Sequence, residues 1–578
     1  MTGNRLDEIV REMLLEGAPR SAPPELRERV AAVPRELGYG RARRSRTLAL
    51  AASVTTVAVL GGTLLGLFAL RSATVGPQPT AASKPTTATV TPGPTPRPAA
   101  AWPFRIANGN LPVRAPDGTL YVSTGPSTSN GQAKVYALDA GGHVKQGWPY
   151  APAGIVGFSR PVLGADGTVY AAGVRYGDNA GAKIFALDSA GDPKAGWSPQ
   201  VEAAPTALTA GGNLFVAPDG DLIVVTWKAP TTRSAQAQQL AALDSHGSLV
   251  AGWPVTLPGY LSCGTTGCAV PALAFDPGGT VYLEVGPALG FSKTFDIVAY
   301  APDGTMRPGW PVRVPGEGFT VAAGGTIYAW GVETDGGQLP STTPLRIVRT
   351  DFTAFDPSGQ VRSGWPLAIP GPASPPYVAA DGTLYIVTGA PDSVARVERI
   401  GTGGQVHELF TLPPTEQAWS YGFGEGNPGR LASPTIGPAG TVYLQVLKDN
   451  SQTQGVLAIA PDGSVPSGWP IWFSAGAAFE SVAPFTTGSG GNVQPPAIAP
   501  DGTVFVAVRQ PGGQGAVLGL GPDGAERQGW PFVEATSART VITDVRVIGE
   551  VVVVTGVTPF NGRSTFVVAL SLDGAPMR

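Results

Sequence analysis

The chain is divided into short apolar runs that are separated by glycine-containing turns. Many turns read Asp-Gly-Thr and are followed by β-branched or aromatic residues, as at positions 168–170 (Thr-Val-Tyr) and 503–505 (Thr-Val-Phe). Glycine adopts the positive φ of tight turns, and the following residue types favour strands. Each segment therefore predicts a β-hairpin. The nine turns are Asp117-Gly118, Asp166-Gly167, Asp219-Gly220, Gly278-Gly279, Gly324-Gly325, Asp381-Gly382, Ala439-Gly440, Asp501-Gly502 and Ile548-Gly549.

The aspartates of these turns are interpreted as turn formers. Glycine is present in all nine copies, whereas aspartate is replaced in four of them. A catalytic carboxylate would not vary in this way between the copies of one chain. Aspartate side chains accept hydrogen bonds from the backbone two residues further on, which explains their preference for turns.

Two further apolar segments complete each unit. A third run after the hairpin ends in Leu-Asp or a variant, as at residues 135–139 and 184–188, and a polar turn and Gly-Trp-Pro follow it. A short segment before the glycine turn, as at residues 161–163 and 496–498, supplies another strand. Four short strands per unit are typical of a propeller blade.

A tryptophan recurs once per unit. The successive spacings are 46, 49, 56, 57, 55, 104 and 61 residues, and because 104 is twice 52, one unit lacks its tryptophan. A period of this length indicates a propeller or a solenoid. Burial between neighbouring blades is the simplest role for so large a side chain at a fixed position. The repeat tryptophans are Trp102, Trp148, Trp197, Trp253, Trp310, Trp365, Trp469 and Trp530.

The two ends of the repeat region complement each other. The last unit ends after residues 567–574 without a Trp-Pro segment, and residues 101–104 are a Trp-Pro segment without a preceding Leu-Asp strand. We therefore expect the region around Trp102 to complete the last blade and close the ring, because closure removes exposed sheet edges. The predicted fold is an all-β propeller of eight or nine four-stranded blades over residues 101–578, with a divergent unit near residues 376–432.

The repeat resembles the quinoprotein-dehydrogenase-like, or PQQ-like, propellers. The resemblance rests on Asp-Gly-Thr-Val-Tyr followed by Tyr-Ala-Leu-Asp, Gly and Trp, and residues 137–148 are similar to that family's tryptophan-docking motif with one additional residue before Trp148. It covers residues 101–578 and implies the architecture. The family contains quinone-dependent dehydrogenases, which use a calcium site, a base and often adjacent cysteines, and also non-enzymatic scaffolds of the bacterial envelope. Fold similarity alone does not decide between them.

The N-terminal region predicts a single membrane span. Residues 47–70 contain no charge and are long enough to cross a bilayer as a helix. Arginines at positions 41, 43, 44 and 46 precede the segment, so the positive-inside rule places residues 1–46 in the cytoplasm and the propeller outside it. A cleaved signal peptide is the alternative, but its preceding region would be long and no clear cleavage site follows.

The segments on either side of the predicted span have different compositions. Residues 71–100 are rich in Pro and Thr and predict an extended linker. In the tail, Leu6, Ile9, Val10, Met13 and Leu14 form an apolar stripe, and a second short helix is expected after residue 23. Two interpretations stay open: a docking site for a cytosolic partner, and an anchor with no partner.

Composition fits an extracytoplasmic protein. Charged residues make up 14% of the chain, below the typical quarter, and the net charge of −3 gives no reason to expect a nucleic-acid partner. Only Cys263 and Cys268 are present, and in an oxidising compartment we expect them to form a small disulfide loop. No metal site is predicted.

The sequence contains no recognisable catalytic motif. The three histidines occupy repeat turns, which lie far apart in a propeller, and no cofactor is predicted. The best candidate for ligand binding is a loop that interrupts the repeat, in which aromatic side chains accompany a carboxylate and an arginine that could hold a sugar or peptide. Its residues are Trp419, Tyr421, Phe423, Glu425 and Arg430.

Two classes of function follow from these features. The first is a membrane-anchored, non-enzymatic propeller that binds an envelope protein, peptide or glycan as a scaffold or sensor. The second is a PQQ-dependent envelope oxidoreductase. The first accounts for the tail, the span and the linker, whereas the second rests on the resemblance alone.

Overall fold

The computed structural model describes residues 102–577 apart from short segments between or within strands. The tail, the predicted span and the linker (residues 1–46, 47–70 and 71–100) lie outside the described residues, as does residue 101. The described part contains no helix that is long and apolar enough to cross a membrane. The segments left out between residues 102 and 577 are 126–131, 176–181, 204–213, 228–237, 262–272, 287–293, 336–345, 390–393, 419, 422–429, 449–452, 474–476, 480, 483–491, 535–539 and 559–563.

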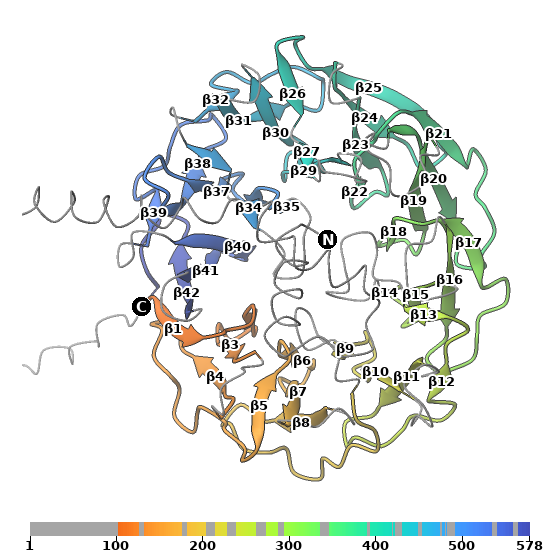
Figure 1. The fold of residues 1–578 in the computed structure, drawn as a ribbon, viewed down its shortest axis with the longest axis vertical. Helices are drawn as coiled ribbons and strands as arrows, with labels where there is room; N and C mark the ends of the chain where they lie inside the picture. Colours follow the sequence, from red (N-terminus) through yellow and green to blue (C-terminus); the bar gives the residue numbers. More distant parts are fainter. Residues whose placement is uncertain are drawn as a thin grey trace, which may run out of the picture. The chain divides into compact units, whose positions relative to one another are not determined.

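Nine antiparallel sheets formed by the described residues surround a central axis (Figure 1). The fold is therefore a nine-bladed β-propeller, the higher of the two predicted counts. The first three blades are blade 1, β2 (Val113–Arg114), β3 (Leu120–Ser123) and β4 (Val135–Leu138); blade 2, β5 (Ile155–Phe158), β6 (Val162–Leu163), β7 (Val169–Arg175) and β8 (Lys183–Leu187); and blade 3, β9 (Leu214–Val216), β10 (Leu222–Trp227), β11 (Gln238–Leu243) and β12 (Val255–Thr256).

Blades 4 to 6 follow in chain order. The predicted divergent unit near residues 376–432 begins with a regular four-stranded sheet, which is blade 6. The bounds are, for blade 4, β13 (Tyr260–Leu261), β14 (Leu273–Phe275), β15 (Val281–Gly286), β16 (Thr294–Tyr300) and β17 (Val312–Pro315); for blade 5, β18 (Gly318–Val321), β19 (Ile327–Thr334), β20 (Ile347–Phe355) and β21 (Leu367–Pro370); and for blade 6, β22 (Tyr377–Val378), β23 (Leu384–Thr388), β24 (Arg396–Ile400) and β25 (Val406–Thr411).

In blades 7 and 8, two separate short strands pair with the same longer strand at the inner edge of the sheet. A small hairpin accompanies each of these blades. Blade 7 consists of β26 (Glu416–Ala418), β29 (Thr435–Ile436), β30 (Val442–Lys448), β31 (Thr453–Ile459) and β32 (Ile471–Trp472), with the hairpin β27 (Ser420–Tyr421) and β28 (Arg430–Leu431); blade 8 consists of β33 (Ala478–Phe479), β36 (Ala497–Ile498), β37 (Val504–Arg509), β38 (Gly515–Leu520) and β39 (Phe532–Val533), with the hairpin β34 (Ser481–Val482) and β35 (Asn492–Val493).

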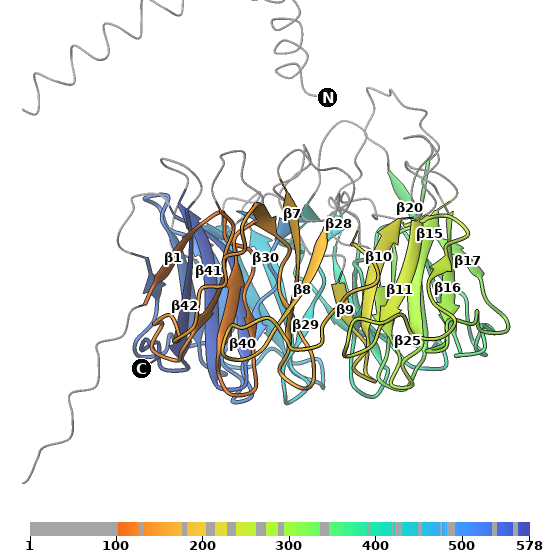
Figure 2. The same ribbon diagram turned by 90° about the horizontal axis from the view of Figure 1, so that it is seen from below.

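Blade 9 joins the two ends of the propeller. It contains β40 (Val541–Ile548), β41 (Val551–Thr558) and β42 (Ser564–Ser571), and its outer strand is β1 (Phe104–Ala107). β1 pairs antiparallel with β42, and Phe104 lies opposite Val567. Figure 2 shows β1 beside β42 and β41 at the rim. The predicted closure of the ring is confirmed.

The glycine turns have the predicted geometry. All nine glycines have positive φ, from +65° at Gly549 to +98° at Gly220. In the first turn the carboxylate of Asp117 accepts hydrogen bonds from the backbone N–H and the hydroxyl of Thr119, both at 2.9 Å. The turn therefore uses aspartate as a local hydrogen-bond acceptor, in agreement with the interpretation from sequence.

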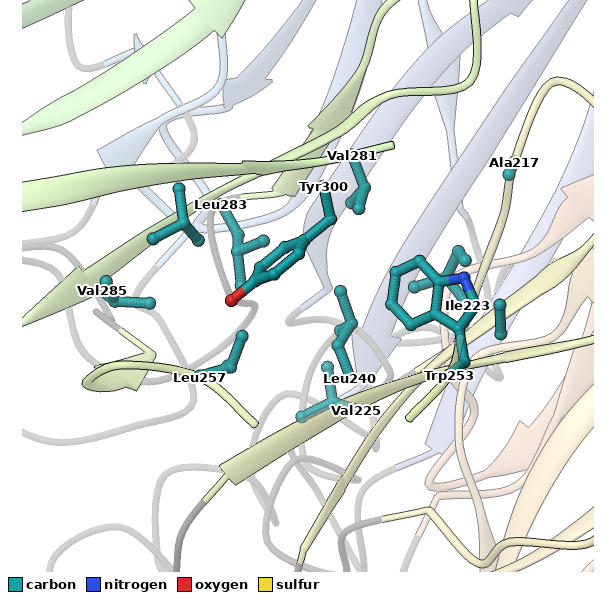
Figure 3. Close-up of a cluster of buried hydrophobic side chains, with 12 residues drawn as sticks. Ala217, Ile223, Val225, Leu240, Trp253, Leu257, Val281, Leu283, Val285 and Tyr300 are labelled. Carbon is teal, nitrogen blue, oxygen red and sulfur yellow. The ribbon is translucent and has the colours of Figure 1, made fainter. Parts of the chain in front are cut away.

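The hydrophobic core is divided among the interfaces between blades. β15 is buried at every position, because a neighbouring blade covers each face of the middle strands. Figure 3 shows the interface of blades 3 and 4, where Leu240 and Trp253 of blade 3 lie near Val281 and Tyr300 of blade 4. The described residues contain nine such clusters, one for each pair of adjacent blades, including blades 9 and 1.

Seven of the eight repeat tryptophans reach the next blade. Each donates its indole N–H to a carbonyl oxygen in the turn after the third strand of that blade, and each precedes a cis proline. Trp197 differs, because Ser198 follows it and its indole donates to Ile184 O of its own blade at 3.3 Å. The seven bonds are Trp102–Ala140, Trp148–Ser189, Trp253–Pro302, Trp310–Pro357, Trp365–Thr402, Trp469–Pro522 and Trp530–Leu572.

Blade 6 is the unit that lacks its tryptophan. Its outer strand β25 places Leu409 next to the turn of blade 7, where a Cβ added to Gly463 would lie 2.5 Å from the Leu409 carbonyl oxygen. Leu409 also packs against the cluster between blades 6 and 7. A smaller side chain and a close backbone contact thus occupy the interface that a tryptophan occupies elsewhere.

Candidate functional site

Inner strands of the blades line cavities around the propeller axis, and two of these cavities share several lining residues. The larger, of about 1070 Å³, is lined by residues of blades 1 to 4 and by Arg546 of blade 9. The smaller, of about 660 Å³, is lined mainly by blades 1, 7, 8 and 9. Both are lined by Val113, Arg114, Arg160 and Arg546. Three arginines from three adjacent blades therefore lie where the two cavities meet, and we call Arg114, Arg160 and Arg546 the arginine cluster.

Arg160 is positioned by a break in the inner edge of blade 2. It lies between β5 and β6, directly after the fully buried Ser159. The Ser159 backbone N–H donates to Ala172 O at 2.7 Å, and the Ser159 hydroxyl accepts from the Ala172 N–H at 3.0 Å. These bonds fix the backbone at the break. Arg160 then donates from Nη2 to the carbonyl oxygen of Pro112 at 3.3 Å.

Arg546 and its neighbour Asp544 come from β40 of blade 9. The register of β40 against β41 shifts between Ile542 and Asp544, a bulge of the kind that redirects side chains. The Asp544 side chain is only 6% exposed, and its Oδ2 lies 2.8 Å from Arg546 Nε. Gln494 of blade 8 donates from Nε2 to Asp544 Oδ1 at 2.6 Å. One buried carboxylate therefore pairs with Arg546 and lines the same cavity as Arg114 and Arg160.

The arginine cluster carries more positive charge than its surroundings neutralise. Burial lowers the pKa of Arg160, and the charge of Arg546 lowers it further, while Asp544 acts in the opposite direction. A guanidinium has five N–H donors. Among the described residues Arg160 uses one of them, and Arg114 makes only a long contact of 3.5 Å with Ile548 O. Most donors of the cluster are thus available to an anion.

The larger cavity has an apolar wall away from the arginines. Leu163 of blade 2, Val216 of blade 3, and Leu273 and Phe275 of blade 4 line it, and all four side chains are half-buried. They belong to the inner strands β6, β9 and β14. The cavity therefore combines hydrocarbon surface with a few charged groups, which is typical of small-molecule and peptide sites.

The end of the larger cavity near the Asp-Gly turns carries two ion pairs. Asp117 and Asp166 line it, and each carboxylate is paired with a lysine of its own blade. Lys145 Nζ lies 3.7 Å from Asp117 Oδ2, and Lys194 Nζ lies 2.9 Å from Asp166 Oδ2. The Thr119 backbone N–H lowers the pKa of Asp117. Each carboxylate is neutralised by its lysine, so this end adds no unpaired positive charge for a second anion.

The ligand loop predicted from sequence is only partly described. Tyr421 and Arg430 lie opposite each other in the hairpin of β27 and β28. Trp419, Phe423 and Glu425 lie outside the described residues. Cys263 and Cys268 also lie outside them, so the disulfide stays a prediction.

The arginine cluster was not found from the sequence. In the sequence, Arg114 lies 46 residues before Arg160, and Arg160 lies 386 residues before Arg546. No motif surrounds any of the three. The available signal was an arginine in or beside the innermost strand of a unit, since Arg114 lies in β2, Arg546 in β40 and Arg160 between β5 and β6. Only ring closure brings blade 9 next to blade 1 and unites the three.

The described residues contain no group of three or more His, Cys, Asp or Glu side chains that could hold a metal ion. The chemistry that the site supports is hydrogen bonding and charge pairing with a bound anion. It contains no described nucleophile with an adjacent base.

Comparisons with known proteins give only distant structural matches. No protein-family model and no curated protein matches the sequence. Similar solved structures include a eukaryotic initiation factor, at 11% identity over 79% of this chain and 94% of that chain with a TM-score of 0.45. A puromycin hydrolase matches at 15% identity over 66% of this chain, 55% of its own length and a TM-score of 0.34. The propeller domain of the Trilobed protease from Pyrococcus furiosus matches at 12% identity, over 61% of this chain and 94% of that domain, with a TM-score of 0.31. At these values no activity is carried over, and the chain is assigned a propeller fold without a family.

Proposed function

We propose that this protein is a membrane-anchored, non-enzymatic binding module whose ligand enters the central channel of the propeller. Residues 47–70 serve as the anchor, residues 1–46 lie in the cytoplasm, and residues 71–100 hold the propeller away from the membrane. Support for the anchor comes from the sequence: an uncharged stretch of sufficient length follows a cluster of arginines.

The binding role is supported by the larger cavity of the central channel. The larger channel cavity has a volume of about 1070 Å³, and apolar side chains and the arginine cluster line it. Ligand pockets are typically concave, mostly apolar and provided with a small number of polar groups that orient the ligand. A segment of an envelope protein, a peptide or a glycan residue could enter such a space. If the protein acts as a sensor, residues 1–46 bind a cytosolic partner.

The test of the binding role compares crosslinked partners captured from intact cells by full-length variants. Val113 lines both cavities, so Val113→Trp should obstruct the place where they meet and abolish capture of the ligand protein or glycoconjugate. Val406→Trp is the matched control, because Val406 lies on the outer strand β25 and is 40% exposed. Both variants must retain the melting temperature of the parent. Equal capture by Val113→Trp and the parent would contradict a channel ligand.

The anchor and the tail are tested in the same cells. Removal of residues 47–70 should release the protein from the membrane fraction, whereas removal of residues 1–40 should leave it in the membrane and release any cytosolic partner. Retention in the membrane without residues 47–70 would contradict the anchor. If the protein without residues 1–40 captures the same partners as the parent, the protein is an anchored scaffold and the proposed sensor role is contradicted.

The alternative is a PQQ-dependent oxidoreductase. The described residues contain no group of three or more His, Cys, Asp or Glu side chains, and the proposal contains no step through a quinone or calcium. Addition of pyrroloquinoline quinone and Ca²⁺ to the protein, followed by a dye-linked dehydrogenase assay, separates the two functions. Saturable binding with turnover would replace the proposed function.

A further inference from the structure

We infer that the channel ligand is a single carboxylate at the end of an apolar chain, held by the arginine cluster while the chain lies along the apolar wall of the larger cavity. This inference rests on the proposed function and names the chemical class of the ligand. Two sources provide this chemistry, a fatty acid and the C-terminus of an apolar peptide.

The positive charge of the arginine cluster favours an anionic ligand. Arg114, Arg160 and Arg546 contribute three positive charges, and among the described residues that line the smaller cavity Asp544 is the one carboxylate. Arg546 uses its Nε on Asp544, and the described contacts of Arg114 and Arg160 are to neutral carbonyl oxygens. Guanidinium groups bind carboxylates through paired N–H donors in a planar fork. An anion in this position satisfies donors that the described residues leave without partners.

The apolar wall of the larger cavity favours a ligand with a hydrocarbon chain. Leu163, Val216, Leu273 and Phe275 line the same cavity as the arginines and are half-buried. A hydrocarbon chain that covers this wall is stabilised by about 25 cal/mol for each Å² of apolar surface removed from water. A small inorganic anion or a sugar acid would leave the wall exposed to water. The wall thus favours an anion with an aliphatic or aromatic extension.

The end of the larger cavity near the Asp-Gly turns favours a ligand with one charged group. Asp117 and Asp166 lie in the same cavity and are already paired with Lys145 and Lys194. In each pair the ammonium group neutralises the carboxylate, so this part of the cavity adds no unpaired positive charge for a second anionic group. The unpaired positive charge is confined to the arginine cluster, which favours a ligand with a single anionic end group.

The experiment measures binding of five probes to the full-length protein by calorimetry: octanoate, 1-octanol, acetate, a peptide of sequence acetyl-Val-Leu-Phe with a free C-terminus, and the amide of that peptide. We expect octanoate to bind at least tenfold more tightly than 1-octanol, which lacks the charge, and than acetate, which lacks the chain. Comparison of the free peptide with its amide shows whether a peptide carboxylate is the better source.

Substitutions assign the binding to the channel. Arg160→Gln and Arg114→Gln should each weaken octanoate binding roughly tenfold or more, as expected for loss of a charged hydrogen bond. Neither should change 1-octanol binding. Phe275→Ala should weaken octanoate but not acetate. Arg313→Gln is the matched control, because Arg313 is 72% exposed and pairs with Asp296 on the outer strands of blade 4. Melting temperatures identify variants that fail to fold, and Arg114→Lys retains the charge where Arg114→Gln does not.

Each outcome bears on the inference. Equal binding of octanoate and 1-octanol, or unchanged octanoate binding in a folded Arg160→Gln protein, would overturn it, and so would failure of both octanoate and the free peptide to bind. If those probes fail while Val113→Trp still abolishes capture in cells, the channel takes another class of ligand and the proposed function stands. If Val113→Trp has no effect either, both are wrong.

Discussion

Trp253 donates its indole N–H to the carbonyl oxygen of Pro302 at 2.7 Å, and the two residues belong to neighbouring blades. The same bond joins six other pairs of adjacent blades, including blades 9 and 1 through Trp102 and Ala140. A blade of four short strands cannot bury both of its faces alone, so its stability depends on such contacts. The tryptophan is thus the residue that converts a local repeat into a ring.

Replacement of Trp253 tests this contact. Trp253 is 7% exposed, and Trp253→Ala should lower the free energy of unfolding by about 3–5 kcal/mol, since a buried aromatic is lost. Trp253→Phe keeps most of the apolar contact and loses the hydrogen bond, so its cost should be smaller. Thermal and denaturant unfolding measure both variants. Equal effects of the two would show that the hydrogen bond, not the burial, dominates.

The glycine before each tryptophan tests how closely the blades approach. Gly309 has a φ of +86°, and a Cβ at this position would lie 2.0 Å from the carbonyl oxygen of Ser358 in blade 5. Gly309→Ala should cost about 2–5 kcal/mol, from the clash together with the unfavourable φ. Gly167→Ala is the control, because Gly167 has a φ of +82° and open space around its Cβ position. It should cost only about 1–2 kcal/mol. Similar melting temperatures for both variants would contradict the close approach.

The closing strand can be removed by truncation. A protein that begins at residue 98 retains β1, whereas one that begins at residue 108 loses it. The shorter protein also loses the Trp102–Ala140 bond, the contact between Phe104 and Tyr136, and the ion pair of Arg105 with the buried Glu534. We expect it to melt at lower temperature and to self-associate, because the edge of β42 becomes unpaired. Size-exclusion chromatography and calorimetry of the two proteins check this, and identical behaviour would argue against closure by β1.

The Asp166–Lys194 pair predicts a small acid dependence of stability. Burial acts to raise the pKa of Asp166, but hydrogen bonds from Lys194 and Thr168 outweigh it and lower the pKa from 3.8 to about 2. The stabilisation is therefore complete above about pH 4 and is lost as the pH falls through about 2. Since the carboxylate side chain is 54% exposed, solvent screening keeps the effect modest.

Asp166→Asn checks this dependence. It should lower the melting temperature at pH 6, and the difference from the parent should disappear near pH 2. The same substitution in a Lys194→Met background should have less effect at pH 6, because the partner charge is already absent. A difference that does not depend on pH would mean that the turn geometry, and not the charge, is responsible.

The repeat made most of the fold predictable. Each Asp-Gly turn, third strand and Gly-Trp-Pro segment lies within about 50 residues of sequence, and local backbone preferences specify it. The unpaired Trp102 segment also indicated how the ring closes. The bond of Trp197 to its own blade and the contact of Leu409 with blade 7 were not predicted, because packing between units decides them.

The sequence by itself determined the repeated blade, its glycine turns and the residues that join one blade to the next, since these depend on short-range patterns of turns, strands and apolar side chains. The tertiary structure alone decided the count of nine and the arginine cluster. Arg114, Arg160 and Arg546 lie far apart in the chain and acquire a common environment only because the last blade packs beside the first. Their charges then act together across a channel that no local segment contains.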